Sequence, residues 1–159
     1  MKINAGIIGM GIGEKHLEAI DNYKGSSVKI ICEKDSKKYL YLKKKFPKKI
    51  ITQDENIVFK DKDINLVSIA SYDNYHYHQI IKAIKYKKNI IVEKPTFLKP
   101  SQVGEVYKKA SEVGVEIFSV FQNRYNLAVQ RVLKGLAAGE LGKIRSIAVR
   151  VRWCRPQRY

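Results

Sequence analysis

Residues 6–13 read GIIGMGIG, and this stretch decides the expected fold. It overlaps an apolar segment, Ala5–Ile8, that has the composition of a buried strand, and it leads into a helical pattern. Glycine is needed at such a turn because the chain turns tightly there, and because a side chain would keep a phosphate from the backbone amides and the helix N-terminus. The stretch therefore predicts a strand, a loop and a helix that bind a dinucleotide.

The spacing of the glycines departs from the usual dinucleotide fingerprint at one position. The third glycine should stand five residues after Gly9, but Glu14 occupies that position and Gly13 precedes it. A carboxylate at a helix N-terminus is locally favourable, yet it would repel a phosphate placed against it. The loop alone is therefore a weak signal, and the prediction needs a second feature.

Glu33 supplies that feature at the end of the second expected strand. It lies 22 residues after Gly11, where an acidic side chain accepts hydrogen bonds from the adenosine ribose. The acid favours NAD, because a carboxylate would repel the 2′-phosphate of NADP. Nearby lysines leave NADP open as the less favoured cofactor: Lys34, Lys37 and Lys38.

Short apolar segments alternate with helical patterns as far as Phe121. The expected strands are Ala5–Ile8, Val28–Cys32, Leu66–Ala70, Asn89–Val92 and Val115–Phe121. The expected helices are His16–Tyr23, Ser36–Phe46, Tyr77–Tyr86 and Ser101–Val113. Several strands are apolar on both faces, as in a parallel sheet that helices cover. The alternation predicts an α/β fold with a doubly wound parallel sheet, the Rossmann arrangement.

The pattern changes after Phe121. Asn126–Ala138 predicts a helix with one apolar face, and Lys143–Trp153 alternates strictly, as in a strand of a mixed or antiparallel sheet. We therefore expect an NAD-binding Rossmann domain at residues 1–122. Residues 123–159 are expected to be the first helix and strand of a second, α+β domain for substrate binding and oligomerisation, which is cut short.

The chain has 159 residues, 45% of them hydrophobic, and a net charge of +16. Half of that charge lies in residues 124–159, where seven arginines and two lysines accompany one acid, Glu140. Such a surplus suits phosphorylated ligands, nucleic acid or an anionic membrane. Because the lysines are dispersed and no nucleic-acid-reading motif occurs, we prefer phosphate recognition and expect neither nucleic acid nor a membrane as a partner.

Cys32 and Cys154 are too few and too far apart for a disulfide framework or a CxxC metal site. No secretion signal occurs, and no apolar stretch approaches the roughly 20 residues that a membrane helix needs. These features predict a cytoplasmic protein with two reduced thiols and no metal site.

Val92–Pro95, which reads VEKP, ends a buried strand at the edge where ligands bind in parallel sheets. A lysine here can position a hydroxyl and stabilise charge while hydride leaves its carbon. The alternative for Glu93 and Lys94 is a surface ion pair before a turn.

Three features together resemble the glucose–fructose oxidoreductase/inositol dehydrogenase family: the glycine loop with His16, the segment Ser68–His76, and the Glu93-Lys94-Pro95 motif. Residues 122–126 and 149–157 are similar to a narrower branch of that family. The branch contains the UDP-N-acetylglucosamine and glucosaminuronate 3-dehydrogenases of bacterial surface-sugar synthesis. Ser71–Asp73 differs from the Thr-Pro-Asn of many relatives, which agrees with the narrower branch.

The resemblance implies roles for individual residues. The residues implied to hold the pyrophosphate are Gly9, Gly11, Ile12 and Gly13, with Glu33 on the ribose. The residues implied to line the cofactor elsewhere are Ser71, Tyr72, Asp73, His76, Glu93, Lys94 and Gln122. Lys94 is implied as the catalytic residue, and the Lys94–Pro95 bond is often cis in the family. The residues implied to bind substrate are Lys94, Arg124, Tyr125, Arg152 and Trp153.

The histidines leave alternatives open. We expect His16 and His78 to be helix-surface or packing residues. His76 is either part of the cofactor site or a helix-start residue without a ligand contact. The family's segment with an acid/base Asp and His would follow residue 159, so the chain is expected to be an incomplete enzyme.

The resemblance implies an NAD-dependent oxidoreductase that takes hydride from a hydroxyl-bearing sugar carbon, with a UDP-N-acetylhexosamine or its uronate as the favoured substrate. A homo-oligomer is expected for the full-length form. Two alternatives stay open: a non-catalytic NAD(H)-binding fragment or sensor, and a basic Rossmann protein that regulates through nucleic acid.

Overall fold

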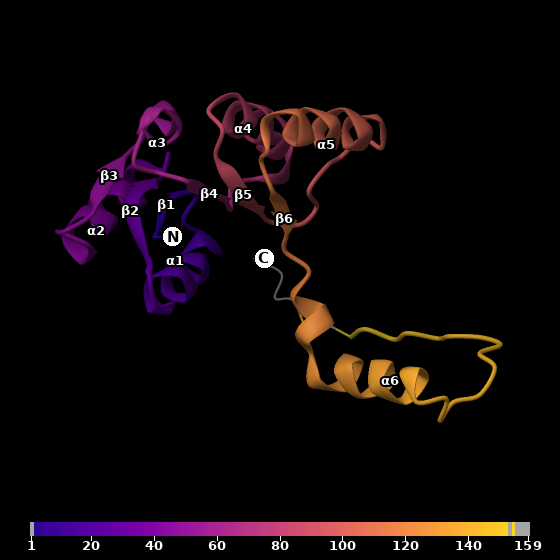
Figure 1. Ribbon diagram of the computed structural model, residues 1–159. Helices are drawn as coiled ribbons and strands as arrows, with labels where there is room; N and C mark the ends of the chain where they lie inside the picture. The colour runs from indigo at the N-terminus through magenta and orange to yellow at the C-terminus, as the bar shows by residue number, and fades with distance from the viewer. Residues whose placement is uncertain (1, 153, 155–159) are drawn as a thin grey trace. The chain divides into compact units, whose positions relative to one another are not determined.

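The computed structural model describes residues 2–152 and residue 154. The chain divides into two compact units, one ending at Phe121 and the other beginning at Gln122 (Figure 1). Each unit is described by itself below.

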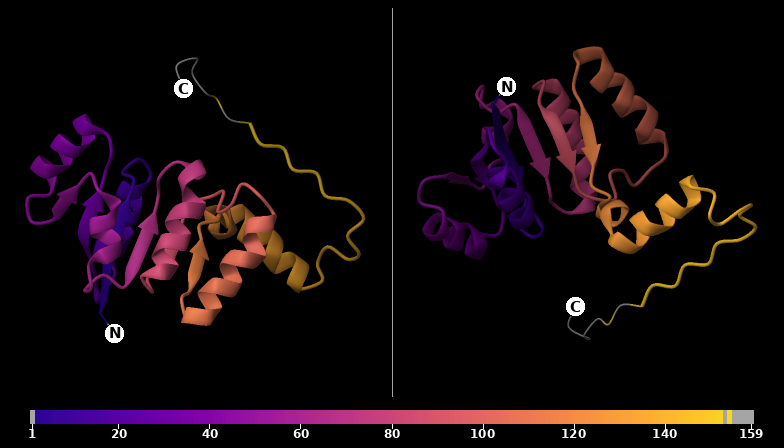
Figure 2. Two further views of the ribbon diagram at one scale, coloured as in Figure 1. Left: turned by 90° about the horizontal axis from the view of Figure 1, so that it is seen from above. Right: turned by 60° about the horizontal axis from the view of Figure 1, so that its bottom comes forward.

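A six-stranded sheet forms the centre of the first unit (Figure 2). The strands are β1 (Ile3–Ile8), β2 (Ser26–Cys32), β3 (Ile50–Thr52), β4 (Leu66–Ile69), β5 (Asn89–Val92) and β6 (Ile117–Ser119). Their order is β3-β2-β1-β4-β5-β6, and every neighbouring pair is parallel. This is the strand order of the Rossmann fold, so the predicted doubly wound parallel sheet is confirmed.

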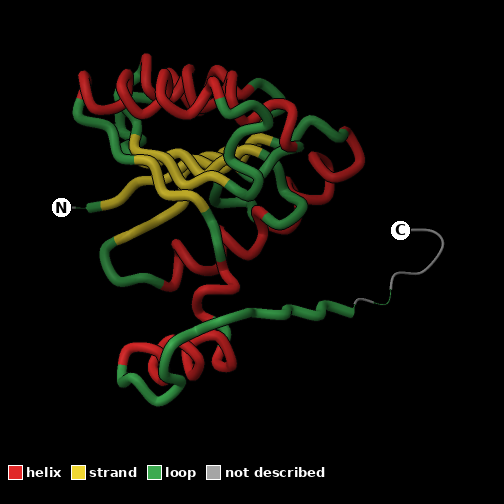
Figure 3. Tube along the Cα trace, turned by 90° about the vertical axis from the view of Figure 1, so that its right-hand side faces the viewer, coloured by secondary structure: helices red, strands yellow, loops and turns green. Residues whose placement is uncertain are grey.

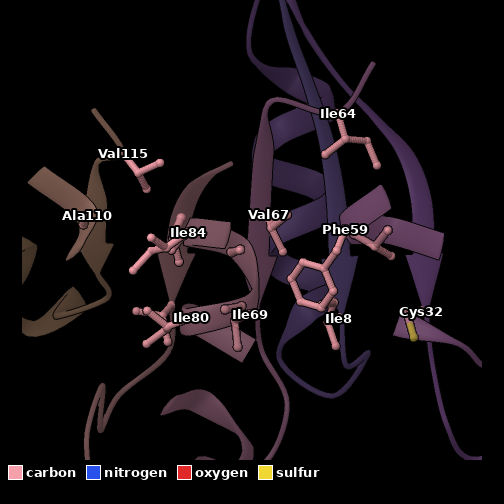
Figure 4. Close-up of a cluster of buried hydrophobic side chains, with 14 of the residues drawn as sticks. Ile8, Cys32, Phe59, Ile64, Val67, Ile69, Ile80, Ile84, Ala110 and Val115 are labelled. Atoms are coloured by element: carbon pink, nitrogen blue, oxygen red, sulfur yellow. The ribbon is translucent and has the colours of Figure 1, made fainter. Parts of the chain in front are cut away.

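Helices cover both faces of this sheet (Figure 3). They are α1 (Gly13–Asn22), α2 (Ser36–Lys45), α3 (Glu55–Lys60), α4 (Asp73–Lys85) and α5 (Ser101–Val113). Ile7 belongs to a buried cluster that includes residues of α1 and α2. Its neighbour Ile8 belongs to another cluster, with residues of α3, α4 and α5, because successive strand residues face opposite sides. Figure 4 shows the larger cluster, which includes Phe59 of α3.

The sequence patterns missed β3 and α3. β3 has three residues and α3 has six, which is too short for a hydrophobic period to be recognised. Local polar contacts define α3 instead, since the Asp54 carboxylate caps its first turn by accepting a hydrogen bond from the Asn56 N–H at 2.9 Å. Two predicted helices also begin earlier than expected, at Gly13 and at Asp73.

The second unit contains the 3-10 helix η1 (Gln122–Tyr125) and the helix α6 (Leu127–Ala137). Asn126 caps α6 by accepting a hydrogen bond from the Ala128 N–H at 2.9 Å, as the predicted helix at 126–138 requires.

The predicted strand at 143–153 is not formed: residues 143–152 have no strand structure, and Trp153 lies outside the described residues. A strand needs a neighbour for its backbone hydrogen bonds, and the described part of this unit offers none. The alternating apolar side chains remain in solvent, with Ile147 77% and Val149 81% exposed. None of the described helices is long and apolar enough to cross a membrane.

Candidate functional site

The glycine loop joins β1 to α1 at the carboxyl edge of the sheet, where the strand order reverses between β1 and β4. Gly9 has a φ of 89°, and a Cβ atom on it would lie 2.6 Å from the carbonyl oxygen of Ala70. Its N–H donates to the carbonyl oxygen of Cys32 at 2.8 Å. Glycine is therefore required at residue 9 by the close approach of three strand ends.

Gly11 and Ile12 have the geometry that a bound pyrophosphate needs. A Cβ atom on Gly11 would meet no atom of the chain within 4 Å, so this backbone is open to a ligand. Ile12 stands at the N-cap of α1, and no side chain caps that end of the helix. Uncapped amides and the helix dipole together favour an anion, so the loop fits the pyrophosphate of a dinucleotide.

The contacts of Gly13 and Glu14 explain how the loop works despite the irregular spacing of its glycines. A Cβ atom on Gly13 would lie 3.1 Å from Cγ2 of Ile7, so Gly13 lets α1 pack closely on the sheet. That is the task of the third fingerprint glycine, here performed one residue earlier. The Glu14 carboxylate forms an ion pair with the ammonium group of Lys45 at 3.1 Å, which offsets its negative charge.

Glu33 is buried at the end of β2 and holds the glycine loop in place. One carboxylate oxygen accepts the Met10 N–H and the other accepts the Asp35 N–H, both at 2.9 Å. Its neighbour Cys32 is buried as well, and burial raises the pKa of that thiol to about 12. The expected contact of Glu33 with a ribose remains a prediction, and the structure adds a role in organising the loop.

Lys34 points towards α3 and α4. Its ammonium group lies 4.7 Å from the centre of the Tyr75 ring and 3.9 Å from the Glu55 carboxylate. Burial alone would raise the pKa of Glu55, but hydrogen bonds from Lys82 and Gln79 lower it below its ordinary value. Lys34 is thus held by Tyr75 and by the ionised carboxylate of Glu55, a residue that the sequence patterns did not single out.

Ser71, Tyr72 and Asp73 follow β4 at the same edge of the sheet. The Ser71 hydroxyl donates to Gln79 Oε1 at 2.6 Å, and Gln79 Nε2 donates to Glu55 at 2.8 Å. Tyr72 is 80% exposed and Asp73 begins α4. The expected cofactor-lining residues therefore lie beside the glycine loop, where a Cβ atom on Gly9 would lie 2.7 Å from the backbone nitrogen of Ser71.

The Glu93-Lys94-Pro95 motif follows β5 at this edge too. The Lys94–Pro95 peptide bond is cis, in agreement with the family resemblance. Glu93 is buried, and its Oε2 accepts the Lys94 backbone N–H at 3.2 Å, whereas Lys94 itself is exposed. The alternative of a Glu93–Lys94 surface ion pair does not fit a buried carboxylate.

His16 has polar partners that the sequence did not reveal. Its Nδ1 lies 2.6 Å from the Ser68 hydroxyl and its Nε2 lies 3.0 Å from Glu93 Oε1. The expectation of a surface or packing histidine was incomplete, because His16 shares the inward face of α1 with Gly13 three residues earlier. That helical spacing was the available signal.

His76 is buried, with its ring nitrogens used inside the protein. Nδ1 lies 2.8 Å from the carbonyl oxygen of Pro95, and Nε2 lies 3.1 Å from that of Ser71. The ring thus links the segments expected to line the cofactor. The expected cofactor contact of His76 remains a prediction, as does its alternative of a helix-start residue without a ligand contact, and the structure adds this linking role.

The remaining predicted residues lie in the second unit. Gln122, Arg124 and Tyr125 lie in η1, and Arg152 lies in residues 143–152, which have no helix or strand structure. Their contacts with cofactor and substrate stay predictions, as does that of Trp153.

Residues 3–121 match the family model GFO_IDH_MocA, described as an oxidoreductase family with an NAD-binding Rossmann fold. The chain belongs to this family. The predicted family, the Rossmann fold and NAD as the family's cofactor are thereby confirmed, and the glycine loop has the geometry that this cofactor needs.

Members of the GFO_IDH_MocA family from several bacteria are similar to the chain. It is 30% identical over 145 residues to the uncharacterized oxidoreductase YdgJ of Escherichia coli, covering 89% of this chain and 41% of YdgJ. It is 24% identical over 139 residues to the myo-inositol 2-dehydrogenase of Thermotoga maritima, covering 87% of this chain and 42% of that enzyme. The chain therefore spans about two fifths of the length of these relatives.

The chain is also similar to a solved structure over its whole length. This is the WlbA dehydrogenase from Bordetella pertussis in complex with NADH and UDP-GlcNAcA, with a TM-score of 0.90 and 25% identity. The match covers 100% of this chain and 49% of WlbA.

Proposed function

We propose that the chain is the cofactor-binding part of an NAD-dependent dehydrogenase that oxidises carbon 3 of a UDP-N-acetylhexosamine or its uronate for surface-polysaccharide synthesis. The observation that carries this proposal is the similarity to WlbA, a protein crystallised with NADH and UDP-GlcNAcA, over the full length of the chain. The family membership and the geometry of the glycine loop support the NAD-dependent part.

The residues at the carboxyl edge of the sheet would divide the work of the reaction. Gly11 and the N-terminus of α1 would bind the pyrophosphate. Bound NAD accepts the hydride. Lys94, exposed after β5, would hold the substrate hydroxyl by a hydrogen bond and stabilise the negative charge that develops on its oxygen.

Arginines of the second unit suit the nucleotide part of the substrate. Arg124 and Arg152 would contact the diphosphate, since guanidinium groups match phosphate oxygens with paired hydrogen bonds. Tyr125, which is 82% exposed, would contribute a ring for contact with the uridine or the sugar. A polyol without phosphate would need none of these arginines.

The test compares substrates by the appearance of NADH. The purified protein is incubated with NAD and, separately, with UDP-N-acetylglucosamine, its uronate and myo-inositol. Reduction with a UDP-sugar supports the proposal. Reduction with myo-inositol alone overturns the nucleotide-sugar assignment. Because the chain spans about two fifths of the length of these relatives, the sensor alternative is tested on a protein that includes the rest of the family fold, and NADH binding without any reduction by that protein favours a non-catalytic sensor.

Lys94→Ala tests the catalytic assignment, with Lys99→Ala as the matched control on a nearby exposed lysine. Loss of a group that hydrogen-bonds the reacting hydroxyl should lower kcat by at least about 100-fold, whereas NADH affinity should be retained. An active Lys94→Ala variant would remove Lys94 from the reaction.

A further inference from the structure

Lys94 stands between two residues that are each hydrogen-bonded to a histidine from a different helix. His16 of α1 contacts the Glu93 carboxylate, and His76 of α4 contacts the carbonyl oxygen of Pro95. We propose that His16 and His76 are positioning residues, which together hold the backbone on both sides of Lys94 and so aim its side chain at the substrate hydroxyl. This inference rests on the proposed function, because it assigns Lys94 to the reaction.

The contact of His16 with Glu93 is shielded from water. Their side chains are 11% and 10% exposed, and Nε2 lies 3.0 Å from Oε1. Ser68 is completely buried in β4, and its hydroxyl oxygen lies 2.6 Å from the other ring nitrogen, Nδ1 of His16. The second Glu93 oxygen accepts the Lys94 N–H, so the order of contacts runs from the sheet through His16 and Glu93 to the Lys94 backbone. Hydrogen bonds to a carboxylate in such surroundings are strong.

The contact of His76 holds the other side of Lys94. The ring is 1% exposed, and its Nδ1 lies 2.8 Å from the Pro95 carbonyl oxygen. Because a carbonyl oxygen only accepts, this contact is a hydrogen bond when Nδ1 carries the ring proton. Nε2 faces the carbonyl oxygen of Ser71 at 3.1 Å, on the loop that follows β4. The ring therefore places Pro95 relative to the neighbouring strand end.

Both histidines connect Lys94 to the loops that would bind the cofactor. His16 lies one helical turn after Gly13, on the helix whose N-terminus fits the pyrophosphate. His76 contacts the carbonyl oxygen of Ser71, and the backbone nitrogen of Ser71 would lie 2.7 Å from a Cβ atom on Gly9. A hydroxyl-binding lysine must be placed accurately with respect to the cofactor, since a displacement of about 1 Å can cost about 100-fold in rate.

Replacing each histidine by glutamine and, separately, by asparagine distinguishes a positioning role of the ring from a role that only fills space. The glutamine amide reaches the place of Nε2, and the asparagine amide reaches the place of Nδ1. His16→Gln therefore keeps a donor for Glu93, whereas His16→Asn keeps only the Ser68 contact. His76→Asn keeps a donor for Pro95, whereas His76→Gln does not. The same two substitutions at His78, which is exposed on α4, serve as controls.

The measurement is the acylation rate of Lys94 by a succinimidyl ester, read by peptide mass spectrometry with and without saturating NADH. Thermal unfolding of each variant verifies folding. In the wild-type chain, we expect bound NADH to slow the acylation of Lys94. His16→Asn and His76→Gln should lose about tenfold of that protection, equivalent to one hydrogen bond at a buried site, whereas His16→Gln, His76→Asn and the His78 variants stay within about twofold.

Equal behaviour of the two variants at either histidine would overturn the proposal, because a space-filling role does not distinguish the two amides. Failure of the proposed function gives a different result: NADH does not bind to the wild-type chain, or it binds and does not slow the acylation of Lys94. In that case the acylation rates of Lys94 without NADH test the positioning role. The rates in His16→Asn and His76→Gln must differ from the wild-type rate, and those in His16→Gln and His76→Asn must equal it. Any other result shows that the positioning role is wrong.

Discussion

The two units carry helices of similar apolar pattern but differ in what those helices bury. In the first unit, Leu17 and Ile20 of α1 are less than one tenth exposed, because the sheet lies against them. In the second unit, Val132 and Leu133 of α6 are 53% and 49% exposed. An amphipathic period is sufficient to define a helix and its cap, whereas burial depends on a second apolar surface.

The reaction rates of the two thiols, Cys32 in the first unit and Cys154 in the second, should show the largest difference between the units. At pH 8, a pKa of about 12 leaves about one Cys32 side chain in ten thousand as the reactive thiolate, and Cys32 is buried in addition. Cys154 of the second unit is exposed. Ellman's reagent should therefore modify one thiol quickly and the other only after unfolding in guanidinium. Cys154→Ser should remove the fast phase, and a second fast thiol in that variant would contradict the burial of Cys32.

Phe59→Ala tests the core of the first unit. Phe59 is completely buried in the larger cluster, so its truncation should lower the free energy of unfolding by about 3–5 kcal/mol, measured by urea denaturation. Phe118→Ala is the matched control, because Phe118 of β6 is 56% exposed. Equal losses for the two variants would show that the sheet does not bury Phe59 as described.

Gly11→Val tests the loop without disturbing the core. A Cβ atom added at residue 11 meets no atom of the chain within 4 Å, so we expect stability to be unchanged, but the valine side chain would block the backbone from the pyrophosphate. NADH affinity, measured by calorimetry, should fall at least about tenfold, or about 1.4 kcal/mol. Gly104→Val in α5, where a Cβ also meets open space, is the control. Unchanged affinity in Gly11→Val would refute the loop assignment.

Of these changes, Leu133→Ser should have the smallest effect, which we measure on the free energy of unfolding. Because Leu133 is about half exposed on α6, the change in the free energy of unfolding should stay within about 0.5 kcal/mol. A loss comparable to that of Phe59→Ala would mean that α6 packs against another apolar surface in solution, and sedimentation of the chain would then show whether that surface is a second copy.

Much of the candidate site could be predicted because its signals are local. The glycine loop, Glu33 and the Glu93-Lys94-Pro95 motif all stand at strand ends, and parallel strands bring their carboxyl ends to one edge. The strand at 143–153 was predicted wrongly for the converse reason: alternation is local, but a strand forms only with a neighbour.

The sequence by itself determined the alternating strands and helices, the position of the cofactor loop and the family of the chain, because composition and spacing along the chain encode these features. Only the tertiary structure decided that Gly13 takes over the third glycine's task and that His16 and His76 hold the residues beside Lys94. The partners of His16 lie 52 and 77 residues away, at Ser68 and Glu93. No local pattern records contacts of that range, since they exist only after the sheet has brought the strand ends together.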